Sequence, residues 1–325
     1  MSVPFYLAPM AEISHRALRE LIEGFGGCDC YFSEMISAGA LLAGGPFEKY
    51  YIDNAPSPEK CVFQLVGADP DEMSKAANLL DKLECRGIDI NMGCSAPLIR
   101  KSGAGAAWMA SIDKAGELIA KVRPQVKRRL SVKLRIGFKD DFDYLVCFCR
   151  RLEEEGIELI TLHPRLVTEK FKRLARWDYV GRLKNELKIP VAGNGDIGAP
   201  EELVRRAAGP CDAVMVGRAA VKMPWIFAET RKLEDLHTET QKYIDQDQEN
   251  SEPSYNIEDV GLKFLDLLSR HQPPEFHLSR AKRFFGFFCE NLKWGTYLKN
   301  QLNREQTLSG IGKVWQDHFR KESNF

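Results

Sequence analysis

The sequence predicts a (β/α)8 barrel (TIM barrel), an α/β fold, followed by a small all-helical C-terminal domain. Three observations lead to this fold class. Short apolar, β-rich runs recur about every 30 residues over the first two thirds of the chain, which is the length of one strand-helix unit. The segments between these runs carry the apolar periodicity and capping residues of helices. Beyond residue 227 the strand pattern stops and helical periodicity continues.

The eight apolar runs are the expected strands of the barrel. They lack polar alternation in their middles, which is typical of parallel strands that are buried on both faces. We expect strands at 3–10, 30–36, 61–66, 87–92, 131–136, 159–163, 189–192 and 213–216.

Three of the intervening helices have recognisable start signals. Ser14 precedes an apolar stripe over residues 17–22, Asp69 and Pro70 precede one over 73–80, and Pro200 precedes one over 203–207. Serine and aspartate are favoured N-caps, and proline is favoured in the first helical turn. The alternation of strand and helix is therefore consistent along the barrel.

The overall composition excludes several classes of protein. The chain is 44% hydrophobic and 28% charged, which is ordinary for a globular protein and unlike a disordered or coiled-coil chain. Its 46 basic side chains balance 46 acidic ones, so nucleic-acid binding would need a local basic patch. No apolar stretch is long enough to span a membrane and no signal-peptide pattern is present, so we expect a cytoplasmic protein.

The nine cysteines are expected to be reduced thiols, because they are odd in number and scattered. The pairs Cys28/Cys30 and Cys147/Cys149 lack the spacing and the histidine partners of zinc sites, so no metal is predicted.

Polar residues return at the carboxyl end of almost every predicted strand. In a barrel of this kind those ends meet at one rim, where active sites are built. Gln64, Lys133 and His163 interrupt apolar runs and would be costly to bury without a partner, which favours a functional role over a packing one. The residues at the rim are Pro9, Met10, Glu34, Gln64, Asn91, Cys94, Lys133, Arg135, His163, Arg165, Asn194, Asp196, Gly217 and Arg218.

Two glycine-containing turns predict a phosphate site at strands seven and eight. Asn194, Gly195 and Asp196 follow the seventh strand, and Gly217 and Arg218 follow the eighth. Barrels commonly hold phosphate at this position, where backbone amides and an arginine can approach an anion. A phosphorylated cofactor or substrate is the expected occupant.

Cys94 lies in the loop after the fourth strand, at the expected mouth of the barrel. A thiol there can act either as a nucleophile or as a proton donor, and these roles require opposite protonation states. The other cysteines are expected to be small core residues.

The C-terminal region carries a candidate basic surface. Residues 278–313 hold seven basic and two acidic side chains, a net charge of +5 that favours phosphate contacts. The interleaved aromatic residues of this region are mostly expected in a helical core. Residues 238–254 form a polar linker or long loop, and we expect a barrel domain at 1–235 and a helical domain at 236–325.

Six ordered motifs of this chain resemble those of the tRNA-dihydrouridine synthases of bacterial type. They are Leu-Ala-Pro-Met at 7–10, Phe-Gln-Leu at 63–65, Asp-Ile-Asn-Met-Gly-Cys at 89–94, Val-Lys-Leu-Arg-Ile-Gly at 132–137, Gly-Asn-Gly-Asp-Ile at 193–197 and Val-Gly-Arg at 216–218. The resemblance covers about 220 residues and implies an FMN-binding barrel with a helical RNA-binding domain. It also implies reduction of specific uridines in tRNA to 5,6-dihydrouridine, with NADPH as the reductant.

The resemblance assigns roles to individual residues. It implies that the flavin ring lies over Ala8, Pro9 and Met10, with Gln64, Lys133 and His163 at its polar edge. It further implies that the flavin phosphate binds at Asn194, Gly195, Asp196, Gly217 and Arg218, and that Cys94 protonates the uracil ring. The residues expected at the RNA are Glu34, Asn91, Arg135, Arg165, Arg280, Lys282 and Arg283.

Two motifs depart from the family pattern. The chain has Gly-Cys-Ser-Ala-Pro where the family commonly has Gly-Cys-Pro, and His163-Pro164-Arg165-Leu166 where it commonly has His-Gly-Arg-Thr.

The residues leave two alternative functions open. One alternative is an FMN-dependent oxidoreductase of small molecules, similar to dihydroorotate dehydrogenase, which would not need the basic tail. The other is a non-catalytic RNA-binding protein on the same fold. A monomer is expected.

Overall fold

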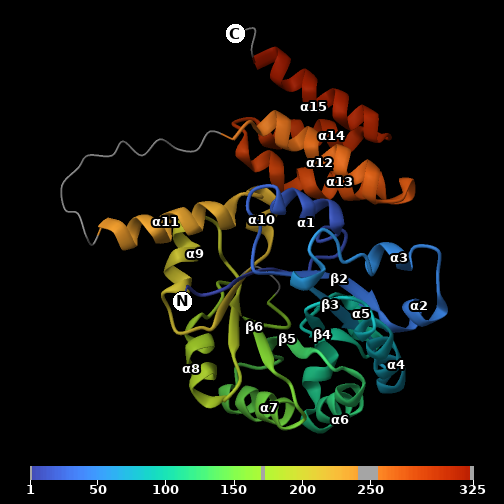
Figure 1. The fold of residues 1–325 in the computed structure, drawn as a ribbon, viewed down its shortest axis with the longest axis vertical. Helices are drawn as coiled ribbons and strands as arrows, with labels where there is room; N and C mark the ends of the chain where they lie inside the picture. The colour runs from blue at the N-terminus through green and yellow to red at the C-terminus, as the bar shows by residue number, and fades with distance from the viewer. Residues whose placement is uncertain (1, 170–172, 241–254, 323–325) are drawn as a thin grey trace.

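The chain folds into a closed barrel of eight parallel strands, each hydrogen-bonded to its neighbours in sequence order, with β1 also paired to β8 (Figure 1). The structure is a computed structural model that describes residues 2–169, 173–240 and 255–322. The strands are β1 (Phe5–Leu7), β2 (Cys30–Ser37), β3 (Cys61–Val66), β4 (Gly87–Met92), β5 (Arg129–Gly137), β6 (Leu159–Leu166), β7 (Val191–Asn194) and β8 (Ala213–Val216). The predicted barrel is therefore confirmed.

Helices cover the outside of the barrel between successive strands (Figure 1). The barrel helices are α1 (Arg16–Glu23), α2 (Ala38–Ala43), α3 (Glu48–Tyr51), α4 (Pro70–Asp81), α5 (Pro97–Lys101), α6 (Ile112–Val122), α7 (Phe142–Glu154), α8 (Asp178–Glu186), α9 (Pro200–Ala207), α10 (Arg218–Lys222) and α11 (Ile226–Thr240). Short 3₁₀ turns are η1 (Pro58–Lys60), η2 (Gly105–Ala110) and η3 (Arg123–Gln125).

Four further helices form the C-terminal region above the barrel in Figure 1. They are α12 (Ile257–His271), α13 (Pro274–Phe288), α14 (Gly295–Arg304) and α15 (Leu308–Glu322), with the 3₁₀ turn η4 (Cys289–Asn291) between α13 and α14. Most of the predicted polar linker, residues 241–254, lies outside the described residues. Among the described helices, none combines the length and the apolar character needed to cross a bilayer.

The strand predictions match best where a charged residue precedes a buried run and a glycine follows it. The strands β3, β4 and β8 have the predicted limits. The strand β6 continues through Pro164 to Leu166, because its pairing with β5 resumes at Gly137 after an irregularity. The strand β1 is shorter than predicted, since the backbone of residues 8–10 leaves the sheet toward the barrel mouth.

Two of the three predicted helix starts are confirmed. The Asp69 carboxylate accepts hydrogen bonds from the backbone N–H groups of Asp71 and Glu72, and Pro200 begins α9. The first helix differs: His15 is its N-cap, and the Ser14 hydroxyl instead accepts a 2.9 Å bond from the backbone N–H of Met10. Ser14 thus fastens the loop that follows β1.

The buried apolar residues form two groups. One fills the inside of the barrel and includes Tyr6, Phe32 and Met215. The other lies between the strands and the surrounding helices, and continues without a break into the C-terminal helices. There Phe264 stacks on Phe284 with ring centroids 3.7 Å apart. The C-terminal region therefore shares its core with the barrel.

The prediction that most C-terminal aromatic residues are core residues is confirmed, with two exceptions. Phe284, Phe285 and Phe288 are buried. Trp294 and Tyr297 are 62% and 65% exposed.

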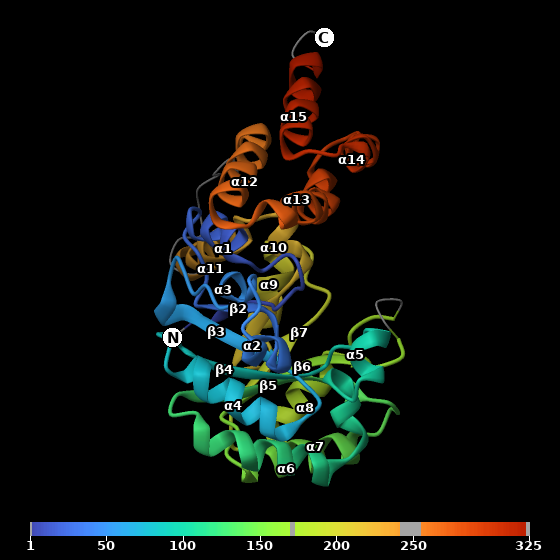
Figure 2. The same cartoon turned by 90° about the vertical axis from the view of Figure 1, so that its right-hand side faces the viewer.

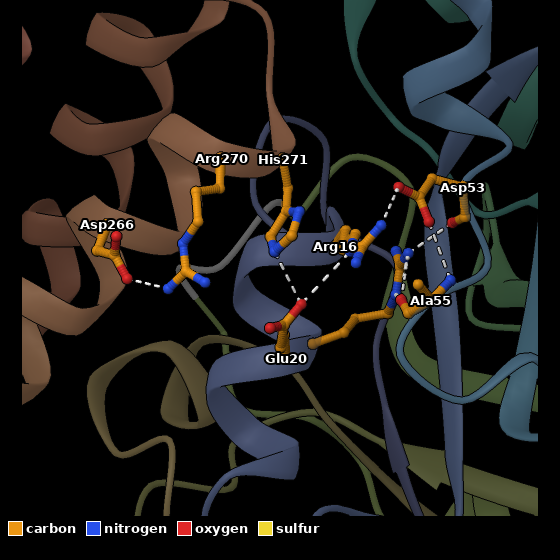
Figure 3. Close-up of polar contacts among 8 residues, drawn as sticks. Arg16, Glu20, Asp53, Ala55, Asp266, Arg270 and His271 are labelled. Atoms are coloured by element: carbon orange, nitrogen blue, oxygen red, sulfur yellow. Dashed lines mark hydrogen bonds and ion pairs between the residues drawn. The ribbon is translucent and has the colours of Figure 1, made fainter.

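Polar contacts also join α1 of the barrel to α12, as Figure 3 shows. Glu20 of α1 accepts contacts from Arg16 at 3.4 Å and from Nε2 of His271 at 2.9 Å, and Arg16 reaches Asp53 at 3.4 Å. Burial of His271, together with the nearby Arg16, lowers its pKa. The imidazole is thus mostly neutral at pH 7, so its contact with Glu20 is not a full ion pair.

Candidate active site

A cavity of about 230 Å³ opens at the carboxyl ends of the strands. Most of the predicted site residues line it, and they come from strands or loops all around the barrel, as expected for this fold. The predicted residues at the cavity are Ala8, Pro9, Met10, Asn91, Cys94, Lys133, Arg135, His163, Arg165, Asn194, Gly195, Asp196, Gly217 and Arg218.

A chain of side-chain hydrogen bonds runs beneath the cavity and ends at the Cys94 loop. Oδ2 of Asp89 accepts a 2.7 Å bond from the Gln64 amide, whose oxygen accepts a 2.8 Å bond from the Asn91 amide. Oδ1 of Asn91 in turn accepts the backbone N–H groups of Gly93 and Cys94, at 3.2 and 2.9 Å. Each donor faces an acceptor, so the orientations of both amides are fixed.

Asp89 is the buried origin of this chain and was not among the predicted site residues. It is fully buried, and its other oxygen accepts a 2.6 Å bond from the Ser131 hydroxyl. Burial raises its pKa to about 6, although the bonds from Ser131 and Gln64 favour the ionised form. The sequence did offer a signal, since Asp89 interrupts the fourth apolar run in the same way as Gln64 interrupts the third.

The Cys94 loop is also held from its other side. The Arg135 guanidinium donates a 3.0 Å bond to the Gly93 carbonyl, and the backbone N–H of Ala106 donates one of the same length to the Cys94 carbonyl. Gly105 lies against this carbonyl with φ +60°, and a Cβ there would come within 2.9 Å of the Cys94 oxygen. Cys94 is the half-buried cysteine at the cavity, and its thiol is held at the mouth by a fixed backbone.

Four cationic side chains surround the cavity, namely Lys133, Arg135, Arg165 and Arg218. Although part of Lys133 faces the cavity, burial of its ammonium group and the nearby Arg135 lower its pKa to about 8. Burial and the surrounding cations lower the pKa of His163 well below its usual value. At pH 7 Lys133 is therefore mostly charged, and His163 is neutral.

His163, Arg165 and Asp196 form one connected group. Arg165 donates bonds of 2.6 and 2.7 Å to the Asp196 carboxylate, and its Nη1 lies 3.1 Å from Nε2 of His163. Because an arginine can only donate, Nε2 of the neutral His163 accepts this bond and Nδ1 carries the proton. The Arg165 side chain is only 2% exposed, so it has almost no surface to offer an RNA and instead contacts His163 and Asp196.

The turns after β7 and β8 leave the predicted phosphate site open to an anion. Gly195 has φ +120°, and a Cβ there would lie 2.9 Å from the His163 ring. Asn194 donates to the Met215 carbonyl at 2.8 Å, which ties the two turns together. The Asp196 carboxylate is engaged by Arg165, so a phosphate contact from Asp196 would have to use its backbone N–H.

Five predicted residues lie away from the cavity lining. Gln64 is fully buried beneath the cavity. Its amide N–H donates to Asp89, and its amide oxygen accepts from Asn91. Glu34 and Arg280 are 2% and 1% exposed and form a 3.1 Å ion pair between β2 and α13. Arg283 of α13 pairs with Glu12 of the barrel, and Lys282 is half-buried beside it. Arg280 and Glu34 therefore belong to the junction of the two regions, because they have almost no surface to offer an RNA.

The loop after β6 is rich in lysine and arginine. Arg176 forms an ion pair with Glu169 at 2.6 Å, and Lys170 and Lys172 lie outside the described residues. Within the described residues, no group of three or more His, Cys, Asp or Glu side chains is placed to hold a metal ion.

Comparison with known proteins identifies the family. The family described as "Dihydrouridine synthase (Dus)" matches residues 6–304. The chain is 32% identical to the "Probable tRNA-dihydrouridine synthase" of Aquifex aeolicus, over 74% of this chain and 76% of that one. It is 31% identical to "tRNA-dihydrouridine synthase B" of Pasteurella multocida, over 92% of this chain and 87% of that one.

A solved structure of a 2-naphthoyl-CoA reductase is similar in fold alone, with a TM-score of 0.53 and 12% identity over 71% of this chain and 50% of that one. The family match extends over the whole barrel and most of the C-terminal helices. This chain belongs to the dihydrouridine synthase family.

Proposed function

We propose that this protein reduces specific uridines in tRNA to 5,6-dihydrouridine, using FMN as the bound cofactor and NADPH as the reductant. One observation carries the proposal: Cys94, Lys133, His163 and Arg218, from four different strands or strand ends, converge on one cavity in a chain of this family. A thiol beside several cations suits a reaction that both delivers a proton and develops negative charge.

The residues at the cavity fit FMN. The open turns at Gly195 and Gly217, together with the Arg218 guanidinium, suit its phosphate. Ala8, Pro9 and Met10 offer an apolar wall for a flat ring, and Lys133 offers a positive charge at the ring's polar edge. When bound and reduced, the flavin would supply a hydride to carbon 6 of the uracil.

In the proposed mechanism the Cys94 Sγ–H bond breaks, and its proton goes to carbon 5 of the uracil. The thiolate that remains would be stabilised by the positive charges of Lys133 and Arg135, which line the same cavity. Solvent then returns a proton to the thiolate. The balance over one turnover is one uridine, one NADPH and one proton converted to one dihydrouridine and one NADP⁺.

Other parts of the chain have supporting roles in this proposal. Asn91 holds the Cys94 backbone, while Arg165 keeps Nε2 of His163 as an acceptor. We also propose a barrel domain at 1–235, a helical RNA-binding domain at 236–325, a cytoplasmic location and a monomeric state.

The experiment that tests the function is mass spectrometry of tRNA digested after incubation with the purified protein, FMN and NADPH. We expect a gain of two hydrogens at a defined uridine. Cys94→Ala should lower kcat by about 10²–10⁴-fold, the usual contribution of a positioned proton donor, with FMN affinity unchanged. A protein that binds FMN but leaves tRNA unchanged while it reduces a small enone would favour the small-molecule oxidoreductase instead.

A further inference from the structure

A second hollow, of about 950 Å³, lies outside the active-site cavity, between α10, η4 and the start of α14. Its lining includes the lysines Lys222, Lys293 and Lys299 and the aromatic residues Trp294 and Tyr297. Figure 2 shows α14 on the same side of the molecule as α5, the short helix that follows the Cys94 loop. The helix whose start lines the hollow therefore lies on the same side of the molecule as the helix that follows the Cys94 loop.

The two aromatic side chains are exposed in a way that core packing does not explain. Trp294 is 62% and Tyr297 is 65% exposed. The other four tryptophans of the chain, Trp108, Trp177, Trp225 and Trp315, are buried or half-buried. Two large, mostly exposed rings three residues apart near a helix start are typical of a binding surface.

The charge of the hollow is complementary to a polyanion. Its three lysines face a single carboxylate, Glu290, which lies 3.7 Å from the Lys222 ammonium. The Lys293 ammonium lies 5.8 Å from the Trp294 ring centroid, so a cation and a stacking face adjoin. This combination of positive charge and exposed rings is the one that binds unpaired nucleotides, through phosphates and base stacking.

The hollow adjoins the active site through α10. Arg218, the first residue of this helix, lines the active-site cavity, and Lys222, its last residue, lines the hollow. A rise of about 1.5 Å per residue separates their backbones by roughly 6 Å along the helix axis, a distance comparable to the spacing of neighbouring nucleotides. The Asn291 side chain fixes this arrangement by donating a 2.6 Å bond to the Lys222 carbonyl.

We propose that Trp294 and Tyr297 form a stacking surface for unpaired bases of the RNA that flank the target uridine, with Lys293 and Lys299 contacting the adjoining phosphates. The inference rests on the proposed function, because it takes the occupant to be the RNA substrate. RNA bound at the hollow would keep the nucleotides next to the target uridine unpaired. The uridine must leave its base stack to enter the cavity, and binding at the hollow would offset part of the free energy that this unstacking costs.

Tryptophan fluorescence tests the stacking directly. Because Trp294 is the most exposed tryptophan, the difference in emission between the wild type and Trp294→Phe isolates its signal. We expect tRNA to quench this signal and to protect it from acrylamide. Emission from Trp294 that stays unchanged at tRNA concentrations saturating the enzyme would overturn the proposal.

Paired substitutions separate stacking from apolar contact. Trp294→Phe and Tyr297→Phe keep a ring, whereas Trp294→Leu and Tyr297→Leu keep apolar surface without one. We expect the leucine double variant to raise KM for tRNA at least tenfold with kcat changed less than threefold, and the phenylalanine double variant to stay within threefold of wild type. Equal KM values for the two double variants would show that stacking is not used, and would overturn the proposal.

A charge control completes the test. Lys293→Gln should reduce the slope of tRNA affinity against salt by about one. Lys127→Gln, the same change at an exposed lysine just before β5, at the end of the barrel opposite the mouth, should leave the slope unchanged. Equal slopes for both variants would contradict the phosphate contact. FMN binding is measured throughout: a wild type that binds FMN but neither binds nor reduces tRNA would refute the proposed function itself, whereas active wild type with unaffected variants would refute only the stacking surface.

Discussion

At the residue scale, the site contains two buried ionisable groups of opposite charge, and each offsets part of the free-energy cost of burying the other. Asp89 and Lys133 lie on the adjacent strands β4 and β5, and each lowers the cost of ionising the other. Burial raises the pKa of Asp89 to about 6 and lowers that of Lys133 to about 8. Both groups are therefore charged only in a window around neutral pH, which is the range in which we expect the site to work.

The Asp89 carboxylate should destabilise the protein at neutral pH relative to acid. Its pKa is raised above the ordinary 3.8, so the folded protein holds more protons than the unfolded chain between pH 4 and 6. Its contribution to the free energy of unfolding falls as pH rises through that window, by about 3 kcal/mol for a shift of about two units. Asp89→Asn keeps an acceptor for the Gln64 amide, and its own N–H group can donate to the Ser131 hydroxyl, which now donates to Asp89. The substitution removes this pH dependence.

The measurement is urea unfolding of the apo-protein and the Asp89→Asn variant at pH 4.5 and pH 7. We expect the variant to gain stability relative to the wild type on going to pH 7. A difference between the two proteins that is the same at both pH values would contradict the burial of an ionised carboxylate.

Gly195 has a backbone conformation and surroundings that leave little room for a side chain. It has φ +120°, and a Cβ would lie 2.9 Å from the His163 ring and 3.1 Å from Ala175. We expect Gly195→Ala to weaken FMN binding at least tenfold, since strain of this kind costs on the order of 1–3 kcal/mol at the turn that forms the proposed phosphate site.

Gly198→Ala is the matched control, because a Cβ there meets no atom within 4 Å. Titration of the apo-proteins with FMN, followed by flavin fluorescence, compares the two. Equal affinities would remove Gly195 from the phosphate site.

At the scale of single elements, α13 shows two arginines of one helix in opposite environments. Arg280 pairs with Glu34 at 3.1 Å where both side chains are almost fully buried. Arg283, on the next turn, pairs with Glu12 where both side chains are about half exposed. Both pairs join the helical region to the barrel, so position along α13 decides how much each contributes.

We expect Arg280→Ala to lower the free energy of unfolding by about 3–5 kcal/mol, since it leaves the Glu34 carboxylate buried and unpaired. Arg283→Ala should cost less than about 1 kcal/mol, as is usual for exposed ion pairs. Urea denaturation measures both. A double variant, Arg280→Met with Glu34→Leu, should recover most of the loss, and failure to recover it would show that the cost comes from packing rather than from the unpaired charge.

At the scale of the whole molecule, the barrel and the C-terminal helices are joined by a shared apolar core. Buried residues of α1, such as Leu18 and Ile22, belong to the same continuous cluster as Phe264 and Trp315 of the C-terminal helices. Separating the two regions would expose this surface to water, at about 25 cal/mol per Å². The two regions should therefore unfold together.

A single unfolding transition is the expected result. Far-ultraviolet circular dichroism reports the whole fold, while the emission of Trp315 in α15 and of Trp108 beside the barrel reports each region, in variants that keep one buried tryptophan each. The midpoints in urea should coincide. Two separate midpoints would show that the junction is too weak to couple the regions.

The sequence predicted the barrel well because its signals are local. Asp69 caps α4, and the runs of β3, β4 and β8 each lie between a charged residue and a glycine, so their limits follow from the nearest neighbours. Ser14 shows where local reasoning fails: its hydroxyl can cap a helix or bind a loop, and the contact with Met10 was decided by the path of the chain after β1.

The candidate site also has one part that the sequence predicts and another that depends on tertiary contacts. The sequence by itself predicted most of the side chains at the mouth, because in a closed parallel barrel every strand delivers its carboxyl end to one rim. Glu34 and Gln64 were also predicted there but lie away from the cavity. Only the tertiary structure decided what each then contacts. It joined Gln64 and Asn91 into one chain with Asp89, and it buried Arg280 against Glu34. Strand ends follow from periodicity along the chain, whereas hydrogen-bond partners and burial depend on residues that are far apart in sequence and meet only when the barrel closes and the helices pack onto it.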